Sequence, residues 1–123
     1  MVESENFYRN IFASLVDGIL IISADLRVTK VNQAAEEIFQ RSRSSFEGEP
    51  LSKLFPHQPN IIKKARQSIT EGISFHHVEG IGSHKSNNER FPVNLTFSPL
   101  IKDDLEITAG AILIQDTSLL KEL

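Results

Sequence analysis

The stretch that decides the fold is FPVNLTFSPLIKDDLEITAGAILIQDT, residues 91–117. Four apolar side chains occupy every second position at its start: Phe91, Val93, Leu95 and Phe97. A period of two is typical of a strand with one buried face. Pro99 is expected to end this strand, because proline cannot donate to a β-ladder. A second β-rich run follows at 107–114, after a polar connector of hairpin length, so the two runs predict the centre of an antiparallel sheet.

The remaining elements fall into an order that indicates the fold class. Strands are expected at 18–23, 28–31 and 73–83, and helical segments at 33–39, 45–55 and 60–71. The helical segments lie between two groups of strands along the chain. This order predicts an α+β fold, in which a single five-stranded antiparallel sheet carries helices packed on one face.

Polar residues mark where two of these helices are expected to begin. Asn32 directly follows a strand, and we expect it to be a structural cap whose side chain accepts from a backbone N–H of helix 33–39. Asn60 is expected to cap helix 60–71 in the same way, with Gly72 ending it.

Composition excludes several classes of protein. A chain of 123 residues with 40% hydrophobic residues can form one domain with a real core. The net charge of −3 and the scattered basic residues make a nucleic-acid partner a poor interpretation. Apolar runs are too short to predict a membrane contact by this segment. Cysteine is absent, which removes thiol chemistry and disulfides and favours a cytoplasmic location.

The chain divides into a core and two flanking segments. Residues 1–16 are expected to form an amphipathic helix with apolar residues at four-residue spacing: Phe7, Ile11 and Leu15. This helix could pack on a second copy, which would make the protein a homodimer. Residues 17–118 form the predicted core domain, and 119–123 are read as the start of a linker helix leading to an attached output domain.

Four stretches carry a family resemblance. They are DGILII at 17–22, NQAAEEIF at 32–39, ERFPV at 89–93 leading to SPL at 98–100, and Gly110 followed by Asp116-Thr117. In this order and spacing they resemble the PAS domain, a sensory module of many bacterial signalling proteins. The family usually ends Asp-aliphatic-Thr. Here Asp116 matches the Asp, Thr117 replaces the aliphatic residue, and Ser118 stands at the Thr position.

The resemblance implies a non-catalytic module that senses or dimerises and signals to an attached output domain. In the family the output is most often a two-component histidine kinase, and NtrB-like nitrogen-sensing kinases share this cofactor-free style. An alternative is a PAS module used only for dimerisation or protein interaction, for example in a transcription regulator, with no ligand. A small ligand-binding enzyme is a third interpretation, but the chain lacks a recognisable catalytic constellation.

Metal and cofactor chemistry find little support in the sequence. Of the four histidines, His77 shares an expected strand face with Glu79, whereas His76 points to the opposite face. Two ligands are too few for a metal site. Haem-binding PAS domains carry their axial histidine on the long helix, and helix 60–71 has none. Covalent flavin chemistry needs a cysteine. We therefore expect no metal, haem or covalent flavin.

The buried face of the sheet and the end of the core are the candidate functional regions. Ten apolar side chains are expected to point inward: Leu20, Ile22, Phe39, Leu54, Ile69, Val93, Leu95, Phe97, Ile112 and Ile114. They either pack into a solid core or line a cavity for a small, mostly apolar ligand. Asp116, Thr117 and Ser118 are the candidate signal relay, since the Asp116 carboxylate can cap an outgoing helix.

Overall fold

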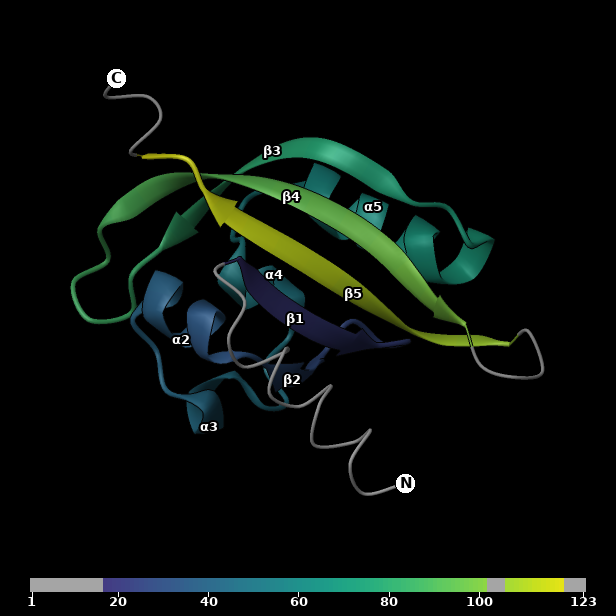
Figure 1. Cartoon of the computed structure of the whole chain (residues 1–123), viewed down its shortest axis with the longest axis horizontal. Coiled ribbons are helices and arrows are strands. Elements are labelled where there is room, and N and C mark those ends of the chain that lie inside the picture. The colour runs from purple at the N-terminus through teal and green to yellow at the C-terminus, as the bar shows by residue number, and fades with distance from the viewer. Residues whose placement is uncertain (1–16, 102–105, 119–123) are drawn as a thin grey trace.

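The structure is a computed structural model that describes residues 17–101 and 106–118. Its centre is one five-stranded antiparallel sheet with the strand order β2-β1-β5-β4-β3 (Figure 1). The strands are β1 (Gly18–Ser23), β2 (Val28–Val31), β3 (Phe75–Ser83), β4 (Arg90–Ile101) and β5 (Ile107–Asp116). The predicted antiparallel sheet is confirmed. The expected helices at 1–16 and 119–123 lie outside the described residues.

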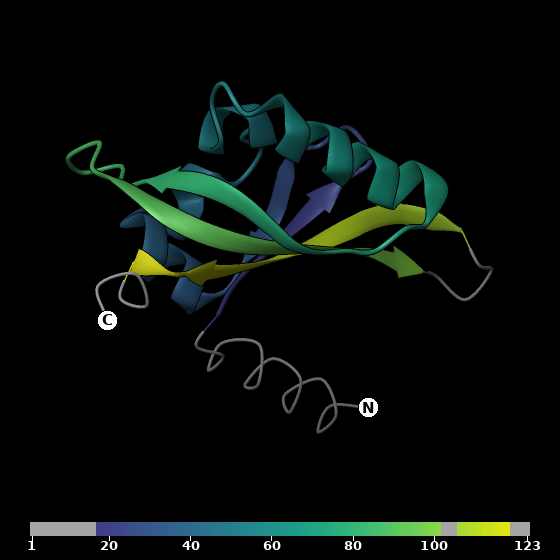
Figure 2. The same ribbon diagram turned by 90° about the horizontal axis from the view of Figure 1, so that it is seen from above.

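The described helices all belong to the segment between β2 and β3. They are α2 (Gln33–Phe39), α3 (Arg43–Phe46), α4 (Leu51–Leu54) and α5 (Pro59–Glu71). They pack on one face of the sheet, and α5 lies across that face (Figure 2). Gly48 has φ +78° and separates α3 from α4, which explains why residues 43–54 form two short turns instead of one helix.

The predicted inward face of the sheet is confirmed by the strand register. Leu20 of β1 pairs with Ile112 of β5, and Ile112 pairs with Phe97 of β4. These three side chains are almost completely buried. Each contributes about 1.5–3 kcal/mol by leaving water, so the three central strands supply much of the stability of the core.

Helix α5 packs close to the sheet at two glycines. A Cβ atom at Gly80 would lie 2.7 Å from Ile61 Cδ1, and one at Gly110 would lie 3.2 Å from Ile69 Cγ1. Real Cβ atoms are essentially never found as close as the first distance. The two isoleucines of α5 therefore occupy space that side chains on β3 and β5 would otherwise fill.

Strand β3 contains a bulge that its sequence did not reveal. The pairing with β4 shifts between Phe75 and Val78, and His77 adopts φ +55°. An extra residue at this point reverses the alternation, so Val78 and Gly80 face inward while Ile81 is 38% exposed. The bulge explains why the apolar residues Phe75, Val78 and Ile81 do not alternate with a period of two.

Two expectations about element ends are wrong. Strand β4 continues through Pro99 to Ile101, with Pro99 opposite Gly110. The Pro92 carbonyl faces Thr117 after β5, so the backbone polar groups of Val93, and of Pro99 with the same parity, face β3 instead. The paired part of β3 ends opposite Phe97. The N–H that Pro99 lacks would therefore have no described strand to pair with.

The start of α5 is the second correction. Asn60 does not cap this helix: α5 begins one residue earlier, with Pro59 in its first turn, and the capping position is Gln58. Proline is favoured there because its fixed φ suits a helix and the first-turn N–H groups need no intrahelical partner. Gly72 does end the helix, as predicted, with φ +69°.

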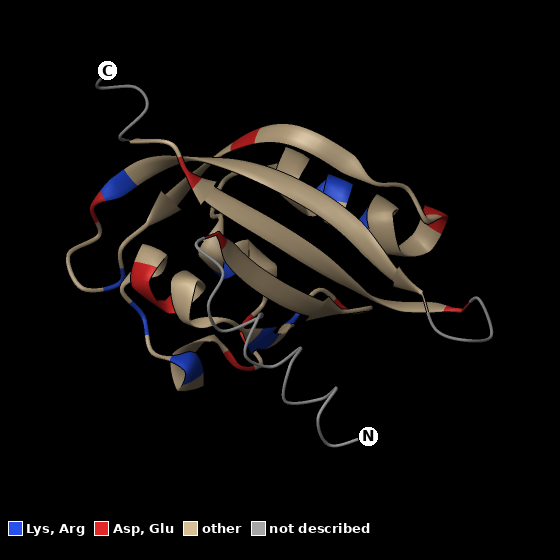
Figure 3. Ribbon diagram, viewed as in Figure 1, with Lys and Arg blue, Asp and Glu red and all other residues tan. Residues whose placement is uncertain are grey.

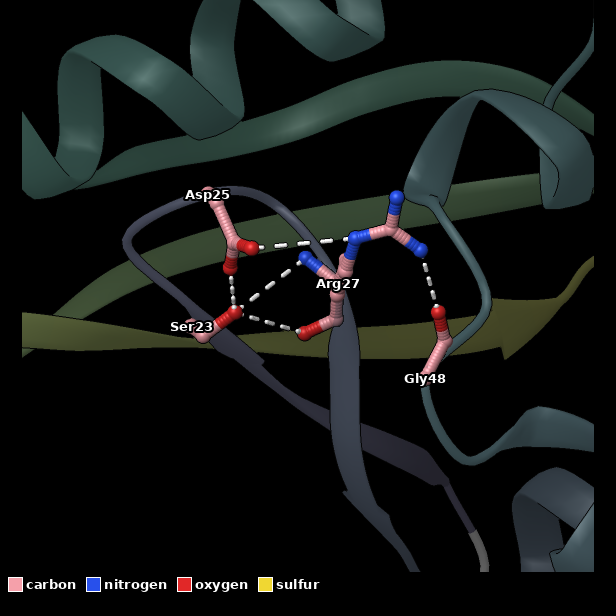
Figure 4. A network of polar contacts seen from close by, with 4 residues as sticks. All are labelled: Ser23, Asp25, Arg27 and Gly48. Carbon is pink, nitrogen blue, oxygen red and sulfur yellow. Dashed lines mark hydrogen bonds and ion pairs between the residues drawn. The ribbon is translucent and has the colours of Figure 1, made fainter.

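The β1–β2 turn holds the α3–α4 connection against β2 (Figure 4). The Ser23 hydroxyl donates to the Asp25 carboxylate, and Arg27 Nε lies 3.7 Å from the same carboxylate group. The Arg27 guanidinium donates through Nη1 to the Gly48 carbonyl at 2.8 Å. Backbone bonds from Val28 to Glu49 and from Gly48 to Val28 continue this pairing. The Arg27 side chain and the edge of β2 together fix the short connection between α3 and α4.

Asn32 joins the start of the sheet to α2, and its predicted capping role is confirmed. Its Oδ1 accepts from the backbone N–H of Ala35 at 3.0 Å and from that of Ile19 at 2.9 Å. Its Nδ2 donates to the Asp17 carbonyl at 3.0 Å. The side chain is buried, so the three bonds replace water for groups that would otherwise lack partners.

Replacing Asn32 with alanine is expected to lower the free energy of unfolding by about 2–4 kcal/mol, because it leaves buried backbone groups unpaired. Urea unfolding measures the change. Asn60→Ala is the matched control: this residue is exposed in the first turn of α5, and its loss should change stability by less than about 0.5 kcal/mol. Equal effects of the two substitutions would contradict the role of Asn32.

Candidate functional site

The ten residues predicted to point inward lie together in one buried cluster. They come from β1, α2, α4, α5, β4 and β5: Leu20, Ile22, Phe39, Leu54, Ile69, Val93, Leu95, Phe97, Ile112 and Ile114. Their common orientation was predictable from parity and helical spacing. Whether they enclose a ligand stays a prediction.

Aromatic rings close one end of this cluster. Phe39 is at its centre, with the rings of Phe46, Phe55 and Phe91 packed edge-on at centroid distances of 5.8, 6.0 and 5.9 Å. Such edge-to-face pairs add to the free energy gained by burial alone. Helices α2 and α3, and the residue that follows α4, are therefore tied to the start of β4 through one ring.

Ser68 is a buried polar residue that sequence reasoning missed. It lies on α5 beside Ile69, is 2% exposed, and its Oγ has no hydrogen-bond partner in the described part of the chain. A buried hydroxyl without a partner is costly, so it is a group that a bound polar atom could satisfy. Its burial could have been predicted from the sequence, because Ser68 follows Ile61 by seven residues and so lies on the apolar face of α5.

The candidate relay residues form a short hydrogen-bonded turn at the end of β5. Asp116 Oδ1 accepts from the backbone N–H of Ser118 at 2.9 Å and from its hydroxyl at 2.7 Å. The Thr117 N–H donates to the Pro92 carbonyl at 3.1 Å. The exit of the domain is thus attached to β4, and the aspartate fixes the direction of the next residue, as a capping side chain does.

Gln58 pairs with the outer edge of β3, and no sequence signal indicated this. Its Nε2 donates to the Ile81 carbonyl at 2.9 Å, and its Oε1 accepts from the Ile81 N–H at 2.8 Å. The amide thereby takes the place of a neighbouring strand at this residue. It also holds the residue before α5 against the sheet.

A hollow lies beside the relay turn on the face of the sheet away from the helices. Its volume is about 550 Å³, and it is lined by Gln58, His77, Glu79, Gly80, Ile81, Pro92, Val93, Asn94 and Thr117. The outward residues of β3 and β4 supply most of these side chains. Sequence reasoning missed this hollow because it depends on the bulge at His77 and on Gln58.

The histidines lie at separate places. His77 Nδ1 is 3.4 Å from Asn94 Nδ2, whereas the His84 ring stacks on Phe91 at a centroid distance of 4.7 Å. His57 lies in the loop before α5 with φ +61°. Within residues 17–101 and 106–118, no three acidic or histidine side chains gather in a way that could hold a metal ion.

Charged residues concentrate on the helices, the turns and the strand ends, while the central strands carry almost none (Figure 3). The basic side chains of α5 face away from the sheet, except that Lys64 Nζ lies 4.6 Å from the Phe75 ring centroid. No helix in the described part of the chain has the length and apolar character needed to cross a membrane.

Comparison with known proteins decides the family. A family model described as PAS domain matches residues 16–118, most of the chain. The chain belongs to the PAS domain family. This match confirms the resemblance seen in the four motifs. PAS domains are signalling modules and are generally non-catalytic. No curated protein matches the whole-chain sequence.

Solved structures confirm the PAS fold. A PAS domain from Colwellia psychrerythraea is similar with a TM-score of 0.82 at 12% identity, over 97% of this chain and 99% of that one. A domain of a sensory box sensor histidine kinase/response regulator from Geobacter sulfurreducens gives 0.73 at 19%, over 92% and 94%. The PAS domain, in complex with ethanol, of a LuxR-family transcriptional regulator from Burkholderia thailandensis gives 0.70 at 20%, over 90% and 97%. Identities this low show a shared fold alone.

Replacing Gln58 with alanine is expected to speed amide exchange at Ile81 by about tenfold, because the edge N–H loses its acceptor. Exchange followed by NMR measures this directly. The Leu95 amide, at the centre of the sheet, should keep its rate. Gln33→Ala is the control, since that side chain donates to Glu37 on α2, away from β3. Unchanged exchange at Ile81 would show that the pairing does not persist in solution.

Proposed function

We propose that this PAS domain regulates an attached output domain, most plainly a two-component histidine kinase, through the turn at Asp116, Thr117 and Ser118. The hydrogen bonds of this turn are the observation that carries the proposal, because they couple β5 and β4 to the direction of the exiting chain. The Geobacter sulfurreducens domain, which belongs to a sensor histidine kinase, supports this choice of output.

A small movement of the sheet can reach this turn directly. Asp116 is opposite Val93, whose side chain belongs to the buried cluster, and Thr117 bonds the adjacent Pro92. A shift of β4 relative to β5 therefore changes the position of both residues. Such a shift would alter the direction or register of the segment after Ser118 and, with it, the activity of the output domain.

The signal in this proposal is a small, mostly apolar molecule bound among the ten inward residues. The PAS domain from Burkholderia thailandensis was solved in complex with ethanol, which supports a small organic molecule as the ligand. The unpartnered Ser68 hydroxyl would give the ligand one polar contact in an otherwise apolar setting. Burial of the lining residues supports an apolar ligand over a charged one.

The second candidate function is dimerisation or protein interaction without a ligand. The observation that favours it is the apolar surface on β4 and β5, where Leu100 and Leu113 are 39% and 38% exposed. The helix predicted from Phe7 to Leu15 would join a homodimer at such a surface. A cytoplasmic location, which the cysteine-free sequence favours, belongs to both versions of the proposal.

Asp116→Ala in the full-length protein is expected to change output activity at least about fivefold, because the turn loses both bonds to Ser118. Autophosphorylation is the measurement if the output is a kinase. Asp25→Ala is a matched control: its carboxylate also accepts from a serine hydroxyl, that of Ser23, but in the β1–β2 turn. Unchanged output in a folded Asp116→Ala protein would refute the relay.

Methyl NMR with n-butanol tests the ligand. The compound is expected to shift the buried methyl resonances of Leu54, Ile69 and Ile112 in a saturable way, and Ser68→Ala should weaken binding by about tenfold. The exposed methyl groups of Ile101 and Leu113 are internal controls. Shifts confined to these exposed groups would contradict an interior ligand and support the interaction module.

A further inference from the structure

The hollow beside the relay turn has the size of a binding site for a small molecule. Its volume of about 550 Å³ falls within the range of ordinary ligand pockets. It opens on the outer face of β3 and β4, so it is separate from the cluster of inward side chains. Only Val93 of the ten inward residues contributes to its lining.

The floor of the hollow presents hydrogen-bond acceptors. Glu79 pairs with Asn94 across β3 and β4, so both side chains point out of the sheet at the same level. Asn94 Oδ1 is shielded from solvent and has no partner in the described part of the chain. Glu79 is exposed, and no described side chain forms an ion pair with it. The site therefore offers an acceptor oxygen next to a negative charge.

The walls are apolar and held in place. Ile81 and Pro92, which are also paired across the two strands, supply the apolar surface. Gln58 uses both ends of its amide on the Ile81 backbone, so it is a fixed wall and not a free polar group. The bulge places the His77 ring beside the Asn94 amide, with Nδ1 3.4 Å from Asn94 Nδ2.

We propose that this hollow binds a small free organic cation, a guanidinium or ammonium group on a short apolar chain. The cation would donate to the Glu79 carboxylate and, once the Asn94 side chain turns to expose it, to Asn94 Oδ1, while its chain would lie on Ile81 and Pro92. A planar guanidinium suits this arrangement, because it offers several donors and no acceptor and loses less hydration than an ammonium. An anionic ligand would face the carboxylate and is not expected.

A ligand in this hollow would touch the exit of the domain. Thr117 lines the site and bonds the Pro92 carbonyl through its N–H. The site could therefore add a second input to the relay turn. Binding itself does not rest on the proposed relay or on an interior ligand, so the titration below tests it independently of both.

The test is a ¹H–¹⁵N NMR titration of the whole chain with N-butylguanidinium. We expect saturable shifts at the amides of Glu79, Asn94 and Thr117. N-Butylurea is the matched neutral compound, because it keeps the shape and most donors but lacks the charge; it should bind at least about tenfold more weakly. Added salt should weaken the guanidinium compound only.

Two substitutions identify the acceptors. Glu79→Gln is expected to weaken N-butylguanidinium at least about tenfold, whereas Glu71→Gln, at an exposed carboxylate on α5, should leave binding unchanged. Asn94→Thr removes the amide oxygen and suits a strand, so it provides a second test should Glu79→Gln fail to fold. Urea unfolding midpoints show that each variant is folded.

The outcomes that overturn the proposal are equally specific. Equal binding of N-butylurea, unchanged binding by Glu79→Gln and Asn94→Thr, or shifts centred on α5 would each exclude the site.

A capped arginine, acetyl-arginine methylamide, distinguishes a free cation from an arginine side chain of a partner. The two amides of this compound have no partners on Ile81 and Pro92, so it should bind more weakly than N-butylguanidinium. Tighter binding than N-butylguanidinium would reject a free ligand in favour of a partner's arginine.

Discussion

Helix α5 packs closely on the sheet at two strand positions that carry glycine. Ile61 fills the space that a side chain at Gly80 would need, and Ile69 does the same at Gly110. Close packing at these two points places α5 over β4 and β5, where the inward side chains require an apolar cover. The short helices α2 to α4 add to this cover, held by the Phe39 ring cluster and by the Arg27 turn.

The sheet brings the entrance and the exit of the domain together. Gly18, at the start of β1, pairs with Ile114 near the end of β5, and Asp116 is opposite Val93 of β4. Asn32 binds the Asp17 carbonyl just before β1, and Thr117 binds Pro92 just after β5. The first and last described residues of this domain are therefore attached to the same three central strands, so one distortion of those strands reaches both.

The two faces of the sheet differ in chemistry. The inner face is apolar and closed by helices, with Ser68 as a buried hydroxyl that lacks a partner among the described residues. The outer face of β3 and β4 carries polar and charged groups next to Ile81 and Pro92. The two proposed ligands, an apolar molecule and an organic cation, would therefore lie on opposite faces of one sheet.

Sequence patterns alone predicted an antiparallel sheet, its inward residues and the cap at Asn32. Alternation in β4 and the parity of β5 depend only on the geometry of an extended chain, and the capping bond of Asn32 goes to the N–H of Ala35, three residues later. These features are local or periodic, so they can be read from neighbouring positions.

Packing between distant segments produces four features that no sequence pattern predicted: the bulge at His77, the pairing of Gln58 with Ile81, the continuation of β4 through Pro99 and the hollow lined by Glu79 and Asn94. Each of these depends on which backbone groups of a distant segment are free to pair. That distribution is fixed when strands and helices dock, and no spacing within one element encodes it.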